Sequence, residues 1–245
     1  MTPDKLEILM VGFPKLKQLT LINMGMSHPM DWIDLYDRLL FRLEILSLGG
    51  EWCKHRILAL DAAGVKAYLS SNSASSVPSR VRDLTISGMD GDLEASMQGQ
   101  LWLIQHCTSL VRFRWTTRTA ANFHGPMHRL AEAFRSGQRW KQLESLVFRG
   151  NFFLEDLVVL MEGIVRLTEL DLSHSNFDFA CWDVLRRKTP HHLQSLRILH
   201  LWRCHSVTGS VVQDMLTSLP NLEDFKGTSL NDTDILSDDR PSVMA

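Results

Sequence analysis

Ten histidines and four cysteines are the residues of this 245-residue chain most able to bind a metal ion. His191 and His192 are adjacent, and His200, Cys204 and His205 follow shortly after them. Zinc sites use such nitrogen and sulfur ligands, but the ligands must converge on one point. The histidine pair lies just before an expected strand, His200 should point to the inner face and Cys204 inward at the turn, so these side chains do not converge. We therefore expect no metal site and no cofactor.

A second pair, His124 and His128, has the four-residue spacing that places two side chains on one face of a helix. Gly125 and Pro126 make this segment a helix start at best, and no glutamate follows His124 as a zinc protease motif requires. Loop histidines account for the pair better. The chain also lacks a glycine-rich phosphate loop, a G-x-S-x-G nucleophile motif and a paired-acid motif with supporting context. We expect no catalytic residues and no enzyme activity.

The elements that would position any functional side chain come from a six-residue pattern, L-x-x-L-x-L, that recurs along the chain. Successive copies begin 24 to 38 residues apart, about 29 on average, at the upper edge of the leucine-rich repeat range. The last two apolar residues of each copy point to one face of an extended chain, so each copy predicts a short strand with one buried side. The copies begin at Leu16, Leu43, Val81, Leu110, Leu143, Leu167, Leu196 and Leu222.

Segments with helical spacing follow the strands. Between the first two copies, apolar residues within 32–40 recur at intervals of three and four, and Pro29 with Asp31 marks a helix start. One strand and one helix per copy cannot bury their apolar faces alone, so neighbouring copies must stack. Further helices are predicted over Leu93–His106, Met127–Phe134, Leu154–Val165, Phe179–Arg187 and Val211–Leu219.

These patterns predict an α/β fold, a leucine-rich repeat solenoid shaped like a horseshoe. The parallel β-sheet should line its concave face and the helices its convex face, in about eight irregular repeats. We assign residues 1–230 to this single domain, with a serine-rich loop inserted at 70–80. A tolerated insertion is the preferred interpretation of that loop, and phosphorylation is the alternative.

Residues 231–245 are predicted to form a C-terminal tail, partly disordered or belonging to a truncated repeat. At the other end, Leu6–Val11 has the pattern of a helix from an earlier repeat. Repeats that reach both ends without polar caps favour a fragment, or a partner that covers the ends.

Composition is that of a globular protein, with 44% hydrophobic residues, 22% charged residues and a formal net charge of −2. Near-neutral charge gives little attraction for a nucleic acid backbone, so we expect no nucleic acid partner. The N-terminal residues do not resemble a signal peptide, and no stretch of eighteen apolar residues predicts a membrane span. The four cysteines are far apart, which favours reduced thiols and a cytoplasmic or nuclear protein.

The segment LRILHLWRCHSVTGSVVQDMLTSLPNL, Leu196–Leu222, resembles the cysteine-containing leucine-rich repeats of F-box proteins. Cys204 lies at the turn after the strand, and Pro220 leads into the next copy. The resemblance implies that a Cys or Asn side chain at this place lies inside and satisfies backbone groups, and Asn151 takes the matching place after the copy that begins at Leu143. The irregular intervals, with many Trp, Cys and His residues, resemble the divergent F-box proteins of fungi.

This resemblance implies a non-catalytic interaction module, the substrate-recognition part of an F-box-type ubiquitin ligase receptor. The protein substrate would bind on the concave face. Because the first strand begins near Leu16, a ligase adaptor would bind only through an F-box that is missing from this chain. The alternative is a leucine-rich repeat sensor or scaffold unrelated to ubiquitin, such as the arm of a ligand-sensing immune-type receptor.

Residues that alternate with the apolar positions of each strand should face the concave side, where curved solenoids usually bind partners. Three arginines would form a basic centre, two acidic residues a strip beside it, and a histidine with a tryptophan an aromatic step beyond. Because Trp and Arg are common interface hot spots, a partner with an acidic group next to an apolar knob would fit. The candidate partner-binding residues are Arg112, Arg114, Arg149, Glu169, Asp171, His200 and Trp202.

Two features of this surface could instead serve the fold alone. Arg149 and Asp171 are expected on adjacent strands, so they could merely pair across the sheet. Trp202 could be covered by its C-terminal neighbours. In either case the residues would stabilise the fold without contacting a partner.

Overall fold

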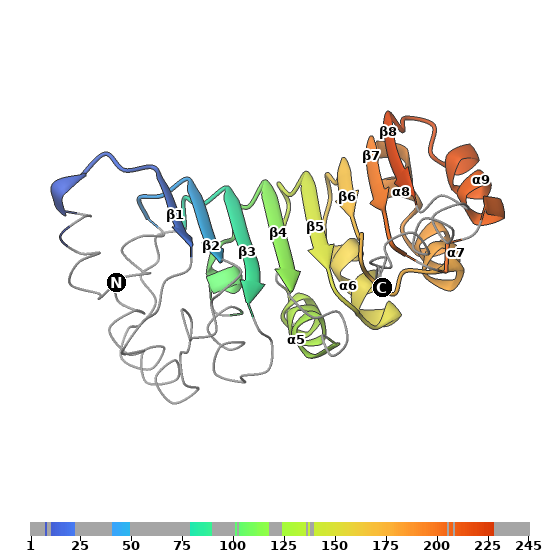
Figure 1. Ribbon diagram of the computed structural model, residues 1–245, viewed down its shortest axis with the longest axis horizontal. Helices are drawn as coiled ribbons and strands as arrows, with labels where there is room; N and C mark the ends of the chain where they lie inside the picture. Colours follow the sequence, from blue (N-terminus) through green and yellow to red (C-terminus); the bar gives the residue numbers. More distant parts are fainter. Residues whose placement is uncertain are drawn as a thin grey trace, which may run out of the picture.

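The computed structural model describes residues 8, 11–22, 41–49, 79–89, 101, 103–117, 124–135, 137, 140–204, 206–207 and 209–227. Each of the eight copies of the repeated pattern forms one strand of a single sheet (Figure 1). The strands follow one another in chain order, and every neighbouring pair is parallel. They are β1 (Gln18–Ile22), β2 (Ile45–Gly49), β3 (Asp83–Met89), β4 (Arg112–Thr117), β5 (Ser145–Arg149), β6 (Glu169–Asp171), β7 (Ile198–Leu201) and β8 (Asp224–Gly227).

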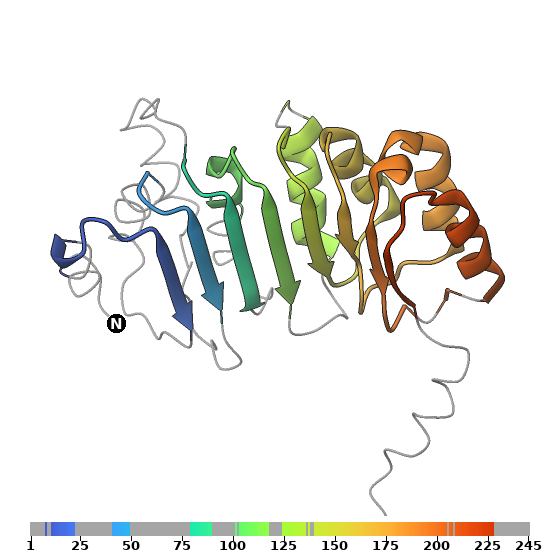
Figure 2. The ribbon, with the colours of Figure 1, turned by 90° about the horizontal axis from the view of Figure 1, so that it is seen from above.

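Along the chain, helices connect the later strands of the sheet. Helices α5, α6 and α7 run along one face of it, which is visible in two perpendicular views (Figures 1 and 2). The predicted parallel sheet with helices beside it is therefore confirmed. The helices with assigned bounds are α5 (His124–Arg135), α6 (Leu154–Gly163), α7 (Phe179–Lys188), α8 (Pro190–Ser195) and α9 (Gly209–Ser218).

A ladder of backbone hydrogen bonds joins successive copies just before their strands. The carbonyl of Lys17, the second residue of the first copy, accepts the N–H groups of Glu44 and Ile45 at 2.7 and 3.1 Å. The carbonyl of Glu44 accepts those of Arg82 and Asp83 in the same way, and the arrangement continues to Arg197, Glu223 and Asp224. Because only main-chain atoms take part, the ladder is independent of the side chains at these positions.

The apolar residues of the strands face the helices and form one continuous core. Leu19, Leu46 and Leu84 start a row of buried residues in matched register across the sheet. In the middle of the row, the Phe113 ring lies 5.1 Å from the Trp140 ring in an edge-to-face contact. The row continues with Phe113, Leu146, Leu170 and Leu199.

Four predicted helices agree with the observed ones apart from their ends, and one segment was interpreted wrongly. Helix α5 begins at His124, so the segment is the helix start that Gly125 and Pro126 allowed, and the preference for loop histidines was wrong. The His128 Nδ1 lies 3.1 Å from the carboxylate of Asp156, which is 1% exposed, and Arg135 donates to the same carboxylate at 2.9 Å. These contacts tie α5 to α6. A glycine and a proline are tolerated at this helix start because the first N–H groups need no intrahelical acceptor.

The turn after β7 has the geometry expected from its cysteine. Cys204 is buried, and its thiol donates a hydrogen bond to the Leu172 carbonyl at 3.2 Å. Asn176, rather than the predicted Asn151, makes such contacts one strand earlier. Its side-chain amide accepts from the Phe152 N–H and donates to the Phe152 carbonyl, at 3.0 and 2.9 Å. One additional residue in this turn moves the asparagine into place.

Several predictions fall outside the described residues. They concern the helix within 32–40, the serine-rich loop up to Pro78 and the tail at 231–245. The predicted Leu93–His106 helix is described only at residues 101 and 103–106, which are helical. Cys107, Cys181 and Cys204 are free and buried, and burial raises the pKa of the Cys107 and Cys181 thiols to about 12. No helix in the described ranges is long and apolar enough to cross a membrane.

The apolar row predicts a large cost for truncation at its centre. Leu170 and Leu199 are register partners and only 3% and 2% exposed. Replacing either by alanine leaves a cavity and should lower the free energy of unfolding by about 2 to 5 kcal/mol, measured by urea denaturation. Glu162→Ala, an exposed change on α6, is the control and should alter it by less than about 0.5 kcal/mol. Losses below about 1 kcal/mol at both leucines would contradict this packing.

A buried histidine predicts a pH-dependent stability. His192 of α8 is 1% exposed, and its Nε2 donates to the Met161 carbonyl at 2.6 Å. Its Nδ1 is buried without a hydrogen-bond partner in the described structure. Burial, together with the neighbouring His191, lowers the pKa of His192 to about 4.

Because an unfolded histidine titrates near 6.5, the folded chain binds fewer protons than the unfolded chain between pH 6.5 and 4. The free energy of unfolding should therefore fall as the pH is lowered through this window, by about 3 kcal/mol from this group at pH 4. His192→Gln can donate to the same carbonyl but does not titrate, so urea unfolding should show a flatter pH profile. Parallel profiles for the two proteins would rule out this origin.

Candidate functional site

The face of the sheet opposite the helices, called here the open face, carries the residues that alternate with the core row. Their register is fixed strand by strand, so they form columns across the sheet. The first column is Gln18, Ile45, Asp83, Arg112, Ser145, Glu169, Ile198 and Asp224. The second column is Thr20, Ser47, Thr85, Arg114, Val147, Asp171, His200 and Lys226.

Two of the three arginines on this face are neutralised by neighbouring strands. Arg112 and Asp83 are register partners, and their charged groups lie 2.7 Å apart. Arg149 reaches diagonally to Asp171 on the next strand, at 2.9 Å. The pairing of Arg149 with Asp171 across the sheet, expected as an alternative, is therefore present. Asp83 is a partner for Arg112 that the strand pattern alone did not reveal.

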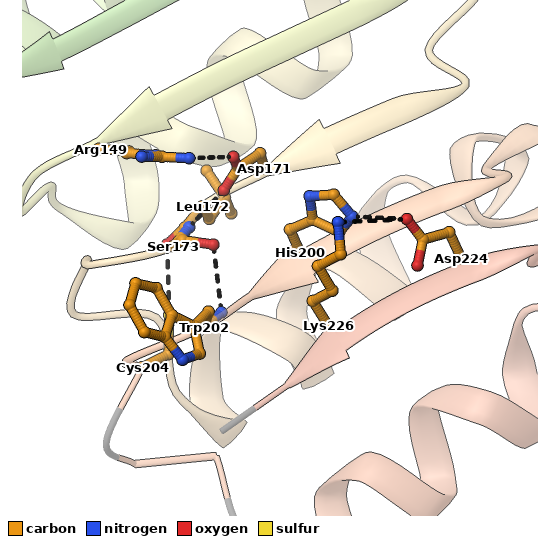
Figure 3. A network of polar contacts seen from close by, with 9 residues as sticks. All are labelled: Arg149, Asp171, Leu172, Ser173, His200, Trp202, Cys204, Asp224 and Lys226. Atoms are coloured by element: carbon orange, nitrogen blue, oxygen red, sulfur yellow. Dashed lines mark hydrogen bonds and ion pairs between the residues drawn. The ribbon is translucent and has the colours of Figure 1, made fainter. Parts of the chain in front are cut away.

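The Asp171 carboxylate is the centre of a polar network at the ends of β5 to β7 (Figure 3). Its side chain is 5% exposed, and it accepts from the Ser173 N–H at 2.9 Å as well as from Arg149. Burial acts to raise the pKa of Asp171, but hydrogen bonds from Ser173 and Arg149 outweigh it and hold the pKa below its ordinary value. The Ser173 hydroxyl in turn accepts the Trp202 N–H at 3.1 Å.

Arg114 differs from the other two arginines because its neighbours in the second column, Thr85 and Val147, are uncharged. Its guanidinium forms no ion pair with any residue that the structure describes. Glu169 is isolated in the same way between Ser145 and Ile198 in the first column. Register thus leaves one cation and one anion of the candidate set without a partner in the described part of the chain.

Arg114 and Glu169 both line a hollow of about 400 Å³ on the open face. Ser145 and Val147 of β5 lie between them and are buried, so the floor in the middle of the hollow is formed by small, uncharged side chains. Across two strand spacings and one step between the columns, the Cα atoms of Arg114 and Glu169 are separated by about 12 Å. The hollow therefore presents opposite charges on either side of a neutral floor.

The two residues of the predicted aromatic step, His200 and Trp202, lie in different environments. His200 is largely buried, and its Nε2 lies 3.0 Å from the Asp224 carboxylate on β8. The hydrogen bond with His200 and the charge of Lys226 lower the pKa of Asp224, despite the opposing effect of desolvation. Trp202 follows the last residue of β7 and is 44% exposed. Trp202 is therefore covered only in part, and its C-terminal neighbour Arg203 lies against one face of the ring.

Sequence reasoning missed two neighbours of Trp202. The Arg203 guanidinium lies 4.5 Å from the centre of the Trp202 ring, and the His174 ring meets the same indole edge-on at 4.9 Å. Both residues occupy the turns after their strands and have φ of 59°. Aligning these turns with the one after β5, where Gly150 has φ of 148°, could have revealed that a glycine position holds larger side chains here.

The histidines and cysteine considered for metal binding do not meet at one point. His191 and His192 lie on α8, whereas His200 contacts Asp224 and Cys204 contacts the Leu172 carbonyl. His205 lies outside the described residues. Within the described ranges, no three His, Cys, Asp or Glu side chains are grouped so that they could hold a metal ion.

Comparison with models of known protein families finds no match for this chain, and comparison with curated proteins finds none either. The case for a function therefore depends on the residues and geometry of the open face.

The Asp171 network predicts unequal costs for removing two arginines. Arg149→Met keeps the side-chain stem but leaves a nearly buried carboxylate with fewer donors, so the free energy of unfolding at pH 7 should fall by about 1.5 to 3 kcal/mol. Arg112→Met is the matched control. Its partner Asp83 is more exposed than Asp171, with 24% against 5% of the side chain accessible, and its loss should cost about 0.2 to 1 kcal/mol.

The loss of unfolding free energy caused by Arg149→Met should also depend on pH. A carboxyl group with a lowered folded-state pKa contributes stability above its unfolded pKa of about 3.9, and that contribution is lost as the pH falls through the folded-state pKa. The difference between wild type and Arg149→Met should therefore shrink in this acid range, measured by urea unfolding between pH 7 and 3. Equal losses for the two arginine variants, or a difference that stays constant with pH, would contradict the network.

Proposed function

We propose that this chain is a leucine-rich repeat module that binds a protein partner on the open face of its sheet. Eight parallel strands in chain order, each formed by one L-x-x-L-x-L copy, support the assignment to leucine-rich repeats. The open face offers a row of polar and charged side chains above an apolar core. Proteins built from stacked repeats use such extended surfaces for recognition.

The observation that carries this proposal is that Arg114 and Glu169 line one hollow and form no ion pair with a described residue. Their neighbours Arg112 and Arg149 are satisfied by ion pairs within the sheet. Arg114 and Glu169 lack such partners in the described structure and line one hollow. Charged groups that are unpaired in the isolated chain can pair with a partner at little cost to the fold, and they give that partner its orientation.

We further propose that the module serves as the substrate-recognition part of an F-box-type ubiquitin ligase receptor. The contact between Cys204 and the Leu172 carbonyl supports the resemblance to cysteine-containing repeats. The module would hold a protein substrate, in the cytoplasm or nucleus, while a separate ligase core performs the chemistry. The module itself would be non-catalytic, with no nucleic acid or membrane partner, and a ligase adaptor would bind only through an F-box.

The ubiquitin link can be tested in the coding sequence upstream of Met1. An in-frame F-box would support a ligase receptor. A nucleotide-binding domain in that place would contradict the ligase link and favour the sensor or scaffold alternative.

Partner binding should be confined to the open face. A photoreactive phenylalanine derivative placed at Thr85 or Ser47 should crosslink a small set of proteins in extracts of cells that produce this chain. The same residue at the exposed helix positions Glu162 or Lys188 should not crosslink these proteins. Mass spectrometry identifies the crosslinked peptides. Equal crosslinking from both faces, or none from the open face, would contradict the proposal.

Arg114→Ala should weaken binding of the identified partner by about tenfold or more, the effect of removing an interface residue worth about 1.4 kcal/mol. Arg187→Ala on α7 removes an exposed arginine from the helix side and should leave binding unchanged. Circular dichroism and urea unfolding would verify that both variants are folded. Unchanged affinity for Arg114→Ala would exclude the hollow from the interface.

A further inference from the structure

The turns that follow β5, β6 and β7 share one backbone position with positive φ. Val147, Asp171 and His200 are matched in register, so the turn residues three positions later also correspond to one another. These residues are Gly150, His174 and Arg203, with φ of 148°, 59° and 59°. Each of the three turns thus has positive φ at this place, and His174 and Arg203 share the left-handed value of 59°.

Glycine is the residue that adopts positive φ without steric cost, because it has no Cβ. His174 and Arg203 therefore lower the stability of their turns relative to glycine. Strained backbone of this kind is commonly found at functional sites. The side chains of His174 and Arg203 are therefore candidates for a functional role that a glycine at the same place could not fill.

Both side chains are arranged around the exposed Trp202 ring. Arg203 stacks over the indole at 4.5 Å, and the His174 ring contacts it at 4.9 Å with an interplanar angle of 85°. The backbone of this part is held in place, because His174 N–H donates to the Trp202 carbonyl at 2.8 Å and Trp202 N–H donates to the Ser173 hydroxyl. Figure 3 shows Trp202 at the end of this hydrogen-bonded network. The indole and the guanidinium are therefore preorganised at the surface.

The charge of Arg203 is not neutralised by the acidic groups near it. Asp171 is engaged by Arg149 and Ser173, and Asp224 by His200 and Lys226. Arg203 has no ion pair with any residue in the described ranges. A guanidinium that contacts an aromatic ring through its face keeps its N–H donors available, because they point along its plane.

We propose that Trp202, Arg203 and His174 form a docking site for an acidic segment of the partner protein. A carboxylate of that segment accepts hydrogen bonds from the Arg203 guanidinium, and an adjacent apolar side chain packs on the exposed part of the indole. One guanidinium beside one aromatic ring matches a singly charged carboxylate. Sites for phosphorylated residues need more positive charge, because a phosphate carries nearly two negative charges and is bound by clusters of arginines. The inference rests on the proposed function, because it assigns a chemical character to that partner.

The test uses the full chain and a defined probe, the peptide amide acetyl-Asp-Glu-Leu-Glu-Asp. Its binding is followed by the indole N–H signal of Trp202 in NMR spectra, assigned by its loss in Trp202→Phe. The probe should shift this signal saturably, and added salt should weaken the effect. The uncharged counterpart acetyl-Asn-Gln-Leu-Gln-Asn amide should not shift it. Equal shifts with both peptides, or none with either, would overturn the proposal.

A glycine substitution separates binding from a purely structural role. Arg203→Gly should keep or raise the midpoint of urea unfolding, because glycine adopts the positive φ without steric strain. The same variant should bind the acidic probe at least tenfold more weakly. His174→Gly should do the same to stability with a smaller effect on binding. A clear fall in the midpoint for Arg203→Gly would show that its stacking on Trp202 serves the fold, which overturns the proposal.

Two more measurements distinguish carboxylate docking at Trp202 from phosphate recognition and from binding elsewhere on the open face. A peptide in which phosphoserines replace the acidic residues would overturn the carboxylate assignment if it binds more tightly than the acidic probe. Crosslinking from Thr85 that persists while the acidic probe fails to bind would leave the proposed function standing and remove only this docking site.

Discussion

The main-chain ladder between successive repeats is the interaction on which the rest of the structure depends. One carbonyl in each copy accepts two N–H groups from the next copy, and this recurs from Lys17 to Glu223. The ladder sets all strands parallel and in one register, with spacing that no side chain has to specify. Intervals of 24 to 38 residues between copies can then be accommodated outside the strands. The apolar residues only need to keep their places in the pattern, and the core row follows.

The same register decides which charges on the open face are satisfied. A charged residue has two neighbours in its column and a few diagonal ones on each adjacent strand. Arg112 finds Asp83 directly beside it, and Arg149 finds Asp171 on a diagonal. Arg114 has Thr85 and Val147 beside it, so its column provides no counterion. Because the backbone fixes these neighbours, an unpaired charge cannot be removed by a small shift of one strand. Which charges of the open face stay unpaired among the described residues is therefore a property of the whole sheet.

Sequence periodicity was sufficient for the strands, for the direction of their side chains and for the places of four helices, though not for most of the helix ends, because each of these depends on local spacing. It failed where one position departs from the repeat. Helix α8 has only six residues, too few for a helical period, and Pro190 at its start was not recognised as a helix signal. The contacts of Asn176 depend on one additional residue in a turn. The pairing of Arg112 with Asp83 requires the register between strands, which one strand's pattern cannot provide. The conformation of His174 and Arg203 becomes visible only when turns are aligned with one another.

The turns after the strands explain how an irregular repeat can keep a regular sheet. Main-chain groups at this edge leave the ladder of the sheet, and side chains satisfy them in different ways. Asn176 bonds both backbone groups of Phe152, Ser173 accepts from Trp202, and Cys204 donates to Leu172. Each solution satisfies the same requirement, that a buried polar group has a partner. Because several residue types meet it, these positions can vary without loss of the fold. Variation in the turns is then able to place aromatic and basic groups such as Trp202 and Arg203 beside the open face.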